Sequence, residues 1–227
     1  MSTTNLDRAA ARVAWQEWWY FGSQYVAGES SSLPIKKAPD KHGTTGKEAS
    51  SGYRQRVYTY FKAGVYPDSN KWKDHKDDAW SAAFISFCMR NAGADGNFPY
   101  SIGHHRYVSA AIRNREAGNV TNTIVAYRHG EIAPSIGDLL WRGRKPQNGM
   151  NTSKWTYDDI LDYINKGGGG FPSHCDLVTE IIEDAEILHA IGGNVANRVL
   201  RMQSKIDEEG MLVDSRYRVI IRNNITE

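Results

Sequence analysis

Ser81 opens the most apolar helix that the sequence predicts, a position that could make it a nucleophile. Asp77 and Asp78 precede the run from Ala79 to Gly93; acidic residues favour a helix N-terminus, and glycine suits a C-terminal cap. The free N–H groups at such an N-terminus stabilise negative charge and can serve as an oxyanion hole. A helix dipole alone does not ionise a serine hydroxyl, so Ser81 would need a histidine to take its proton.

Two histidines are candidates for that partner. His174 begins a predicted strand over residues 174–182, where alternation places Asp176 on the same face and Cys175 on the opposite face. Asp176 could therefore tune His174 or be an exposed sheet residue, and Cys175 is expected in the core. His104 lies in a predicted loop just before a helix, where it could line a cleft, bind a metal or be solvated.

A metal site is an alternative use of the same side chains. His104, His105, His174, Cys175 and Asp176 are residue types that bind zinc. None of them falls in a recognised ligand spacing such as His-Glu-x-x-His. A metal-dependent hydrolase that uses His104 and His174 remains an alternative, whereas two isolated cysteines predict neither a zinc site nor a disulfide framework.

The elements that must position these residues follow from periodicity and capping signals. Helices are expected over residues 6–21, 53–63, 79–93 and 105–116. A further short helix is expected to start at Thr156, whose hydroxyl can cap it together with Asp159 three residues on. Strands are expected over residues 139–142, 174–182, 186–191, 198–203 and 217–221. Residues 28–52 predict a long surface loop. Helices first and strands later indicate an α+β fold.

Composition limits the classes of partner. The 227 residues suit one domain, and a formal net charge of +2 without a basic run argues against nucleic acid. No apolar run is long enough to span a membrane. Charged and polar side chains interrupt residues 9–21, so we expect no secretory signal peptide. We therefore expect the protein to be synthesised in the cytoplasm. Seven Trp and twelve Tyr could stack on sugars or pack the core.

Four segments in order resemble the CHAP-type, papain-like amidases and endopeptidases of bacterial cell walls. They are Trp80–Ser86, with Ser81 where that family has its cysteine; the turn formed by Pro134 and Gly137–Leu140; the strand His174–Val178; and the turn Ile191–Asn194. The resemblance spans roughly half the chain, and it implies a papain-like α+β fold with N-terminal helices packed on a small antiparallel sheet.

The same resemblance implies roles for individual residues. Ser81 would be the nucleophile, His174 the general base and Asn194 the residue that orients it. Apart from these three roles, we expect Trp80, Tyr100, His104 and Asp176 to contact substrate, and we expect no cofactor. It also implies one domain over residues 1–227, with a helical extension over 1–64 and a CHAP-like core over 77–203.

A second resemblance covers the whole chain. A bacterial family of unknown function carries a Trp-Ser-Ala-Ala-Phe-Ile-Ser helix, a Phe-Pro-Tyr-Ser-x-x-His segment and a Ser-His-Cys-Asp strand, which are Trp80–Ser86, Phe98–His104 and Ser173–Asp176 here. This resemblance implies that Ser81 is a family feature, and it brings no established activity.

Together these observations predict a peptidoglycan-directed amide hydrolase, either an amidase or an endopeptidase. Its partners would be peptidoglycan or its peptide stems. Without a signal peptide, delivery machinery would carry it to the periplasm of a target cell, as for an antibacterial effector with an immunity protein, or it would be a phage lysis enzyme. The alternative is a disarmed papain-like fold that binds glycan or peptide.

Overall fold

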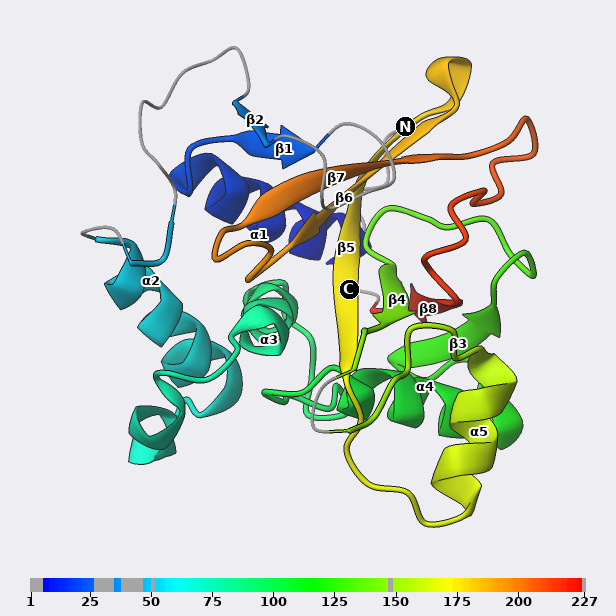
Figure 1. Ribbon diagram of the computed structural model, residues 1–227, viewed down its shortest axis with the longest axis horizontal. Helices are drawn as coiled ribbons and strands as arrows, with labels where there is room; N and C mark the ends of the chain where they lie inside the picture. Colours follow the sequence, from blue (N-terminus) through cyan, green and yellow to red (C-terminus); the bar gives the residue numbers. More distant parts are fainter. Residues whose placement is uncertain (1–5, 27–34, 38–46, 50–51, 147–148, 226–227) are drawn as a thin grey trace.

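The computed structural model describes residues 6–26, 35–37, 47–49, 52–146 and 149–225 (Figure 1). The helices are α1 (Leu6–Tyr20), α2 (Tyr53–Thr59), α3 (Ser81–Asn91), α4 (His105–Glu116) and α5 (Tyr157–Asn165). A π-helical segment (Tyr60–Val65) continues α2, and short 3₁₀ segments cover Asn70–His75 and Glu183–Ala185. The strands are β1 (Gln24–Val26), β2 (Lys36–Lys37), β3 (Ile124–Arg128), β4 (Leu139–Gly143), β5 (Ser173–Ile182), β6 (Ile187–Gly192), β7 (Leu200–Lys205) and β8 (Val219–Asn223).

The eight strands found in the described residues join one sheet, in the order β2-β1-β7-β6-β5-β4-β8-β3. Neighbouring strands are antiparallel except for β1 and β7, which run parallel. The α+β class is confirmed. The sheet differs from the small antiparallel one expected, because the N-terminal segment adds β1 and β2 to its edge. A parallel pair joins segments far apart in the chain, so no local turn signal announces it.

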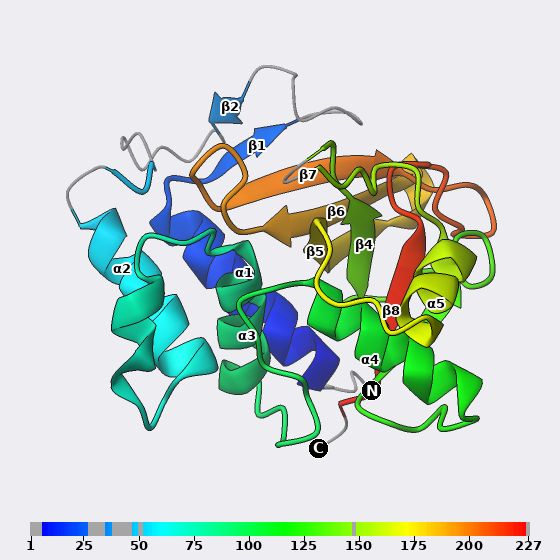
Figure 2. The same cartoon turned by 60° about the horizontal axis from the view of Figure 1, so that its bottom comes forward.

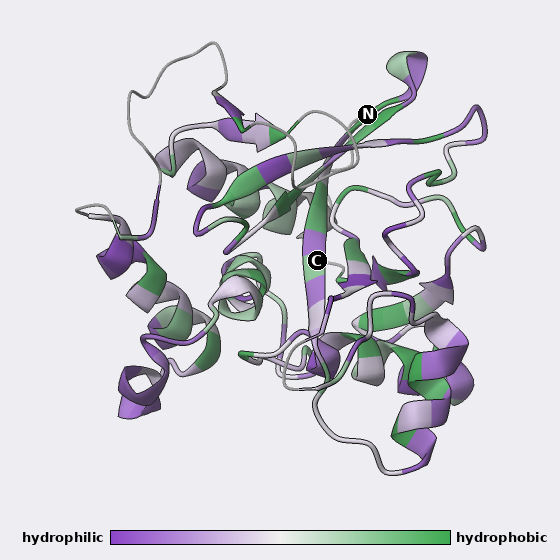
Figure 3. Cartoon of the chain, in the orientation of Figure 1, coloured by the Kyte–Doolittle hydropathy of each residue, from purple (hydrophilic) through white to green (hydrophobic). Residues whose placement is uncertain are grey.

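Helices α1, α3 and α4 lie together on one side of the sheet (Figure 2). The large core between these layers takes apolar residues from all three helices and from alternate strand positions such as Trp141, Cys175 and Leu177. A smaller cluster, which includes Leu140, Val178 and Ile220, lies on the sheet's other face. α5 packs beside α4 and carries both hydrophilic and hydrophobic residues (Figure 3).

Helix α3 is held in place by close backbone contact. Every residue from Ser81 to Met89 is buried, because α3 packs between α1, the π-helical segment and the sheet. A Cβ on Gly64 would lie 2.7 Å from the backbone nitrogen of Phe87, so only glycine lets the π-helical segment approach so closely. The start of α3 is therefore fixed relative to the sheet.

Most of the expected elements are confirmed. α1, α4, β4, β5 and β6 begin and end within about two residues of their predicted limits. α5 begins directly after the predicted Thr156, which forms the capping box with Asp159. β7 and β8 start about two residues later than expected. β1, β2 and β3 were not predicted. Most of the loop expected over residues 28–52 lies outside the described residues, and its described part includes β2.

Candidate functional site

Two helices begin at the same place in the fold. Ser81 is the first residue of α3, and His104 is the residue that precedes α4. The Ser81 Oγ and His104 Nε2 atoms lie 2.8 Å apart, within hydrogen-bond distance. The two residues are 4% and 3% exposed, so this pair is shielded from bulk water. The chain thereby places a hydroxyl against an imidazole at two positive helix ends.

Among the described residues, the His104 ring makes only one polar contact, the one with Ser81 Oγ. Its Nδ1 atom is buried and has no hydrogen-bond partner among the described residues. Burial, followed by the nearby His174 and Arg144, lowers the pKa of His104 well below its ordinary value. His104 is therefore neutral near neutral pH, the state in which Nε2 can accept the Ser81 proton.

Strand β5 supplies a second polar pair. His174 and Asp176 lie on the same face of the strand, and His174 Nε2 lies 2.9 Å from Asp176 Oδ1. His174 Nδ1 lies 3.0 Å from a guanidinium nitrogen of Arg144. Arg144 can only donate, so Nδ1 accepts and Nε2 carries the proton that it donates to Asp176. The contacts therefore fix His174 as one neutral tautomer.

Asp176 is a fully buried carboxylate with several donors. Oδ2 accepts a hydrogen bond from the Tyr217 hydroxyl at 2.8 Å and lies 3.4 Å from Arg142 Nε. Burial alone would raise the pKa of Asp176, but His174 and Arg142 hold it below its ordinary value. Burial, the largest influence, lowers the pKa of His174 to about 4 against the opposing effect of Asp176. The site thus keeps an ionised carboxylate beside a neutral imidazole.

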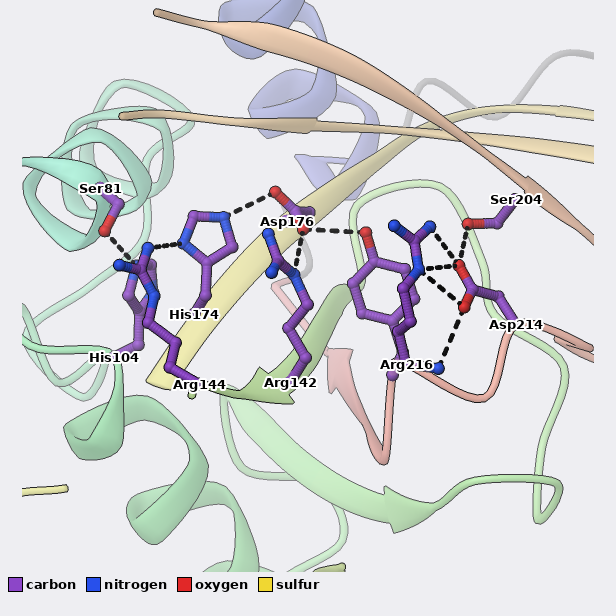
Figure 4. A network of polar contacts seen from close by, with 10 residues as sticks. Ser81, His104, Arg142, Arg144, His174, Asp176, Ser204, Asp214 and Arg216 are labelled. Carbon is purple, nitrogen blue, oxygen red and sulfur yellow. Dashed lines mark hydrogen bonds and ion pairs between the residues drawn. The ribbon is translucent and has the colours of Figure 1, made fainter. Parts of the chain in front are cut away.

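The two pairs lie next to each other. The centroids of the His104 and His174 rings are 5.0 Å apart. Figure 4 shows one set of contacts joining Ser81 to His104, and a second set running from Arg144 through His174 to Asp176. The backbone of β6 lies against the second pair, because a Cβ on Gly192 would come 1.9 Å from Asp176 Oδ1.

The predicted site residues divide into two groups. Ser81, His104, His174 and Asp176 are brought together, and Ser81 is hydrogen bonded to His104, whereas His174 contacts Asp176 and Arg144. Asn194 lies in the turn between β6 and β7 with a φ of 55°, and it makes no hydrogen bond to His174 among the described residues. Asp176 holds the place beside His174 that the resemblance assigned to Asn194.

Trp80 and Tyr100, the other two residues predicted to contact substrate, make hydrogen bonds within the protein. Trp80 is buried against Tyr60 and Phe21, and its indole N–H donates to Glu48 at 2.8 Å. The Tyr100 hydroxyl donates to the carbonyl oxygen of Ala94 at 2.6 Å. Both rings therefore support the segments around the site, and their expected contact with substrate stays a prediction.

Three site residues were not predicted: Arg142, Arg144 and Tyr217. Arg142 pairs with His174 across the antiparallel β4–β5 ladder. Alternation along Leu140, Arg142 and Arg144 could have indicated a charged edge beside the His174 strand. Tyr217 precedes β8 and carries no comparable local signal, because its approach to Asp176 depends on the order of strands in the sheet.

The part of the chain that the structure describes contains no group of three His, Cys, Asp or Glu side chains able to hold a metal ion. Cys88 and Cys175 are buried free thiols, as expected for Cys175 from strand alternation. Within the same residues, no helix has the length and apolar character needed to cross a membrane.

The arrangement can perform proton transfer at a hydroxyl. Ser81 and His104 have the contact needed for general-base activation of a nucleophile. The N–H groups of Ser81 and Ala82 at the start of α3 make no hydrogen bond among the described residues, so they can face a developing oxyanion. The His174–Asp176 pair adds a buried negative charge close to His104.

Comparison with known proteins places the chain in a family. No curated protein and no solved structure matches the sequence. A family model described as an uncharacterized protein conserved in bacteria, DUF2272, matches residues 12–224, which is most of the chain. The chain therefore belongs to the DUF2272 family of bacterial proteins.

Proposed function

We propose that the chain is an amide hydrolase in which Ser81 is the nucleophile and His104 the general base. The observation that carries this proposal is the 2.8 Å contact between Ser81 Oγ and His104 Nε2 at the N-terminus of α3. A neutral imidazole touching the hydroxyl is the arrangement that serine nucleophiles need, because the serine must lose its proton as it attacks.

The steps balance with these two residues and water. Ser81 Oγ attacks the amide carbonyl carbon while its proton passes to His104 Nε2, and the carbonyl oxygen becomes an oxyanion facing the start of α3. The C–N bond then breaks, and the leaving amine takes the proton from His104. Water attacks the acyl-Ser81 ester with His104 again as base, which releases the acid and restores the serine.

His174 and Asp176 would act as positioning residues in this scheme. The Asp176 charge opposes the cost of forming an imidazolium at His104, since it raises the pKa of that ring against the effect of burial. The role of general base that the resemblance implies for His174 would require its Nδ1 atom to leave Arg144 and turn to Ser81. We therefore assign the base to His104 and the support to His174.

The proposed substrate is an amide bond of peptidoglycan, in the peptide stem or where the stem joins the sugar. This assignment, and a papain-like relationship, rest on the segments Trp80–Ser86 and His174–Val178 that resemble cell-wall amidases. Delivery to a target periplasm, with an immunity protein in the producer, belongs to the same proposal.

Reaction with a fluorophosphonate tests the nucleophile directly, because such reagents phosphonylate serines that a histidine activates. We expect a mass increase on a peptide containing Ser81, and its loss in Ser81→Ala and His104→Gln. Ser109→Ala is the matched control, since Ser109 is a buried serine of α4 outside the polar network. Labelling that persists in Ser81→Ala would contradict the assignment.

Incubation with purified peptidoglycan, followed by mass spectrometry of released fragments, tests the substrate. Release by the wild type and the Ser109→Ala variant, but not by Ser81→Ala, is expected. A glycan- or peptide-binding module is the second candidate, and the near-complete burial of Ser81 and His104 favours it. Sedimentation with peptidoglycan without fragment release would select that candidate.

A further inference from the structure

A positively charged pocket lies beside the His174–Asp176 pair. It has a volume of about 590 Å³ and is formed by the end of β4, the β6–β7 turn and the segment before β8. Its lining residues are Arg142, Gly143, Arg144, Lys145, Pro146, Ser153, Asn194, Val195, Ala196 and Arg216. Four of these carry positive charge and none carries negative charge, so the lining as a whole favours an anion.

The four cations differ in how far the protein already neutralises them. Arg142 lies 3.4 Å from Asp176, and Arg216 makes several contacts with Asp214. Arg144 and Lys145 have no carboxylate within the 4.0 Å salt-bridge distance among the described residues. Burial lowers the pKa of Arg144, and Arg142 adds to that effect. A bound anion would relieve this unfavourable charge.

The backbone around Arg144 is rigidly held. Fully buried Thr152 accepts a hydrogen bond from the Arg144 N–H at 2.9 Å and donates its own N–H to the Arg144 carbonyl at 3.1 Å. A Cβ on the adjacent Gly143 would lie 1.8 Å from the Thr152 carbonyl oxygen, so the two segments are in direct contact. These contacts hold the backbone at Arg144, and the 3.0 Å contact with His174 Nδ1 holds its guanidinium, which together reduce the entropic cost of binding a ligand.

We propose that this pocket binds the oxyanion group, a carboxylate or a phosphate, of a ligand larger than a free ion. A guanidinium matches the geometry of both groups, and Lys145 adds a flexible point charge at the rim. The volume falls in the range of about 300–1,000 Å³ typical of small-molecule sites, which leaves room for the remainder of the molecule.

Arg144 also connects this pocket to the candidate active site. Its guanidinium donates to His174 Nδ1, so an anion that contacts Arg144 is sensed at the His174 ring. The interpretation of the anion as part of a substrate rests on the proposed function, and would make the enzyme select amides that carry an acidic group near the scissile bond. Anion binding itself does not depend on Ser81.

Isothermal titration calorimetry at constant ionic strength tests the proposal with three probes. They are inorganic phosphate, N-acetyl-alanyl-alanine with its free carboxylate, and the C-terminal amide of the same peptide. We expect the acid or phosphate to bind and the amide not to bind. Binding of the acid alone identifies a carboxylate site, and binding of phosphate alone identifies a phosphate site. Detectable binding of the acid and the amide with equal affinity, or binding of no probe, overturns the proposal.

Matched variants locate the binding. Arg144→Gln should weaken anion binding at least about tenfold, as expected for losing a charge-assisted contact. Its control, Arg113→Gln, removes the same charge from an exposed position of α4 and should change the affinity less than about twofold. Lys145→Gln, compared with Lys62→Gln, gives the same test if Arg144→Gln does not fold. Equal effects within each pair would refute the assignment.

Two further measurements separate this proposal from the hydrolase. Ser81→Ala should bind the anion with the same affinity as the wild type. If Ser81 proves unreactive while the anion still binds, the proposed hydrolase activity is refuted and the proposed anion site stands. The ¹⁵N resonances of the His174 ring should shift when the anion binds, and this shift should vanish in Arg144→Gln. An unchanged His174 spectrum in the loaded wild type would contradict contact between the anion and Arg144.

Discussion

Acidification from about pH 7.5 to about pH 4.5 is expected to lower the free energy of unfolding by about 2–3 kcal/mol through His174 alone. Burial lowers the pKa of this imidazole to about 4, against an ordinary value of 6.5. Between these two values the unfolded chain binds a proton that the folded chain does not. The contribution of His174 to the free energy of unfolding is therefore fully present above pH 6.5 and is lost as the pH falls toward 4.

The magnitude follows from the size of that window. Each pH unit between 6.5 and about 4 costs about 1.4 kcal/mol, and acidification to about pH 4.5 crosses nearly two of these units. His104 adds to the loss with the same sign, since burial lowers its pKa as well. Asp176 acts at lower pH, because its folded-state pKa is below its ordinary value and its contribution is lost only under stronger acid.

Urea unfolding followed by tryptophan fluorescence at a series of pH values measures this dependence. His174→Gln removes the titrating ring, so its free energy of unfolding should vary over this pH range by about 2–3 kcal/mol less than that of the wild type. Val178→Ala is the control, because it lowers stability at a buried site of β5 without changing any titratable group. Its pH profile should run parallel to that of the wild type.

Parallel profiles for the wild type and His174→Gln would refute the reasoning. An independent check uses the wild type alone, because imidazole resonances report each histidine as it titrates. The His174 resonance should move only as the pH approaches about 4. Titration of that ring near its ordinary pKa in the folded protein would mean that the burial and the Arg144 contact described above do not hold in solution.

Three further substitutions test the supports of the site by urea unfolding. Tyr217→Phe removes a hydrogen bond to buried Asp176 and should lower the free energy of unfolding by about 1.5–3 kcal/mol. Tyr53→Phe is its control, because the Tyr53 hydroxyl has no hydrogen-bond partner among the described residues, and it should cost less than about 0.5 kcal/mol. Equal losses in the two variants would contradict the prediction. Gly192→Ala forces a Cβ against Asp176 and should cost about 1–3 kcal/mol, so unchanged stability would show that β6 is not packed as described. Thr156→Ala removes the capping box of α5 and should cost about 0.5–2 kcal/mol, whereas no loss would indicate that the cap is not formed in solution.

The sequence allowed prediction wherever structure depends on neighbouring residues. The capping box at Thr156 predicts the start of α5, and the glycines after Ile191 predict the end of β6. β1 and β3 were missed, because β1 is short and pairs in parallel with the distant β7, while β3 pairs with β8 at the far end of the chain. These pairings depend on the whole sheet, and no local pattern specifies them.

The candidate site shows the same division. Ser81 at a helix start and the shared face of His174 and Asp176 follow from local periodicity. Sequence could not show that the starts of α3 and α4 meet, which makes His104 rather than His174 the hydrogen-bond partner of Ser81. The position of Arg144 beside His174 depends on the register of β4 with β5, which only the assembled sheet defines.

The contacts of the site also bear on how the chain folds. Ser81 and His104 are 23 residues apart, Arg144 and His174 are 30 apart, and Asp176 and Tyr217 are 41 apart. Forming each contact requires closing a long loop, and proteins rich in such distant contacts fold slowly. The individual helices can form early, whereas the polar network is complete only after β8 has joined the sheet. Recovery of the site during refolding should therefore lag behind recovery of helical structure.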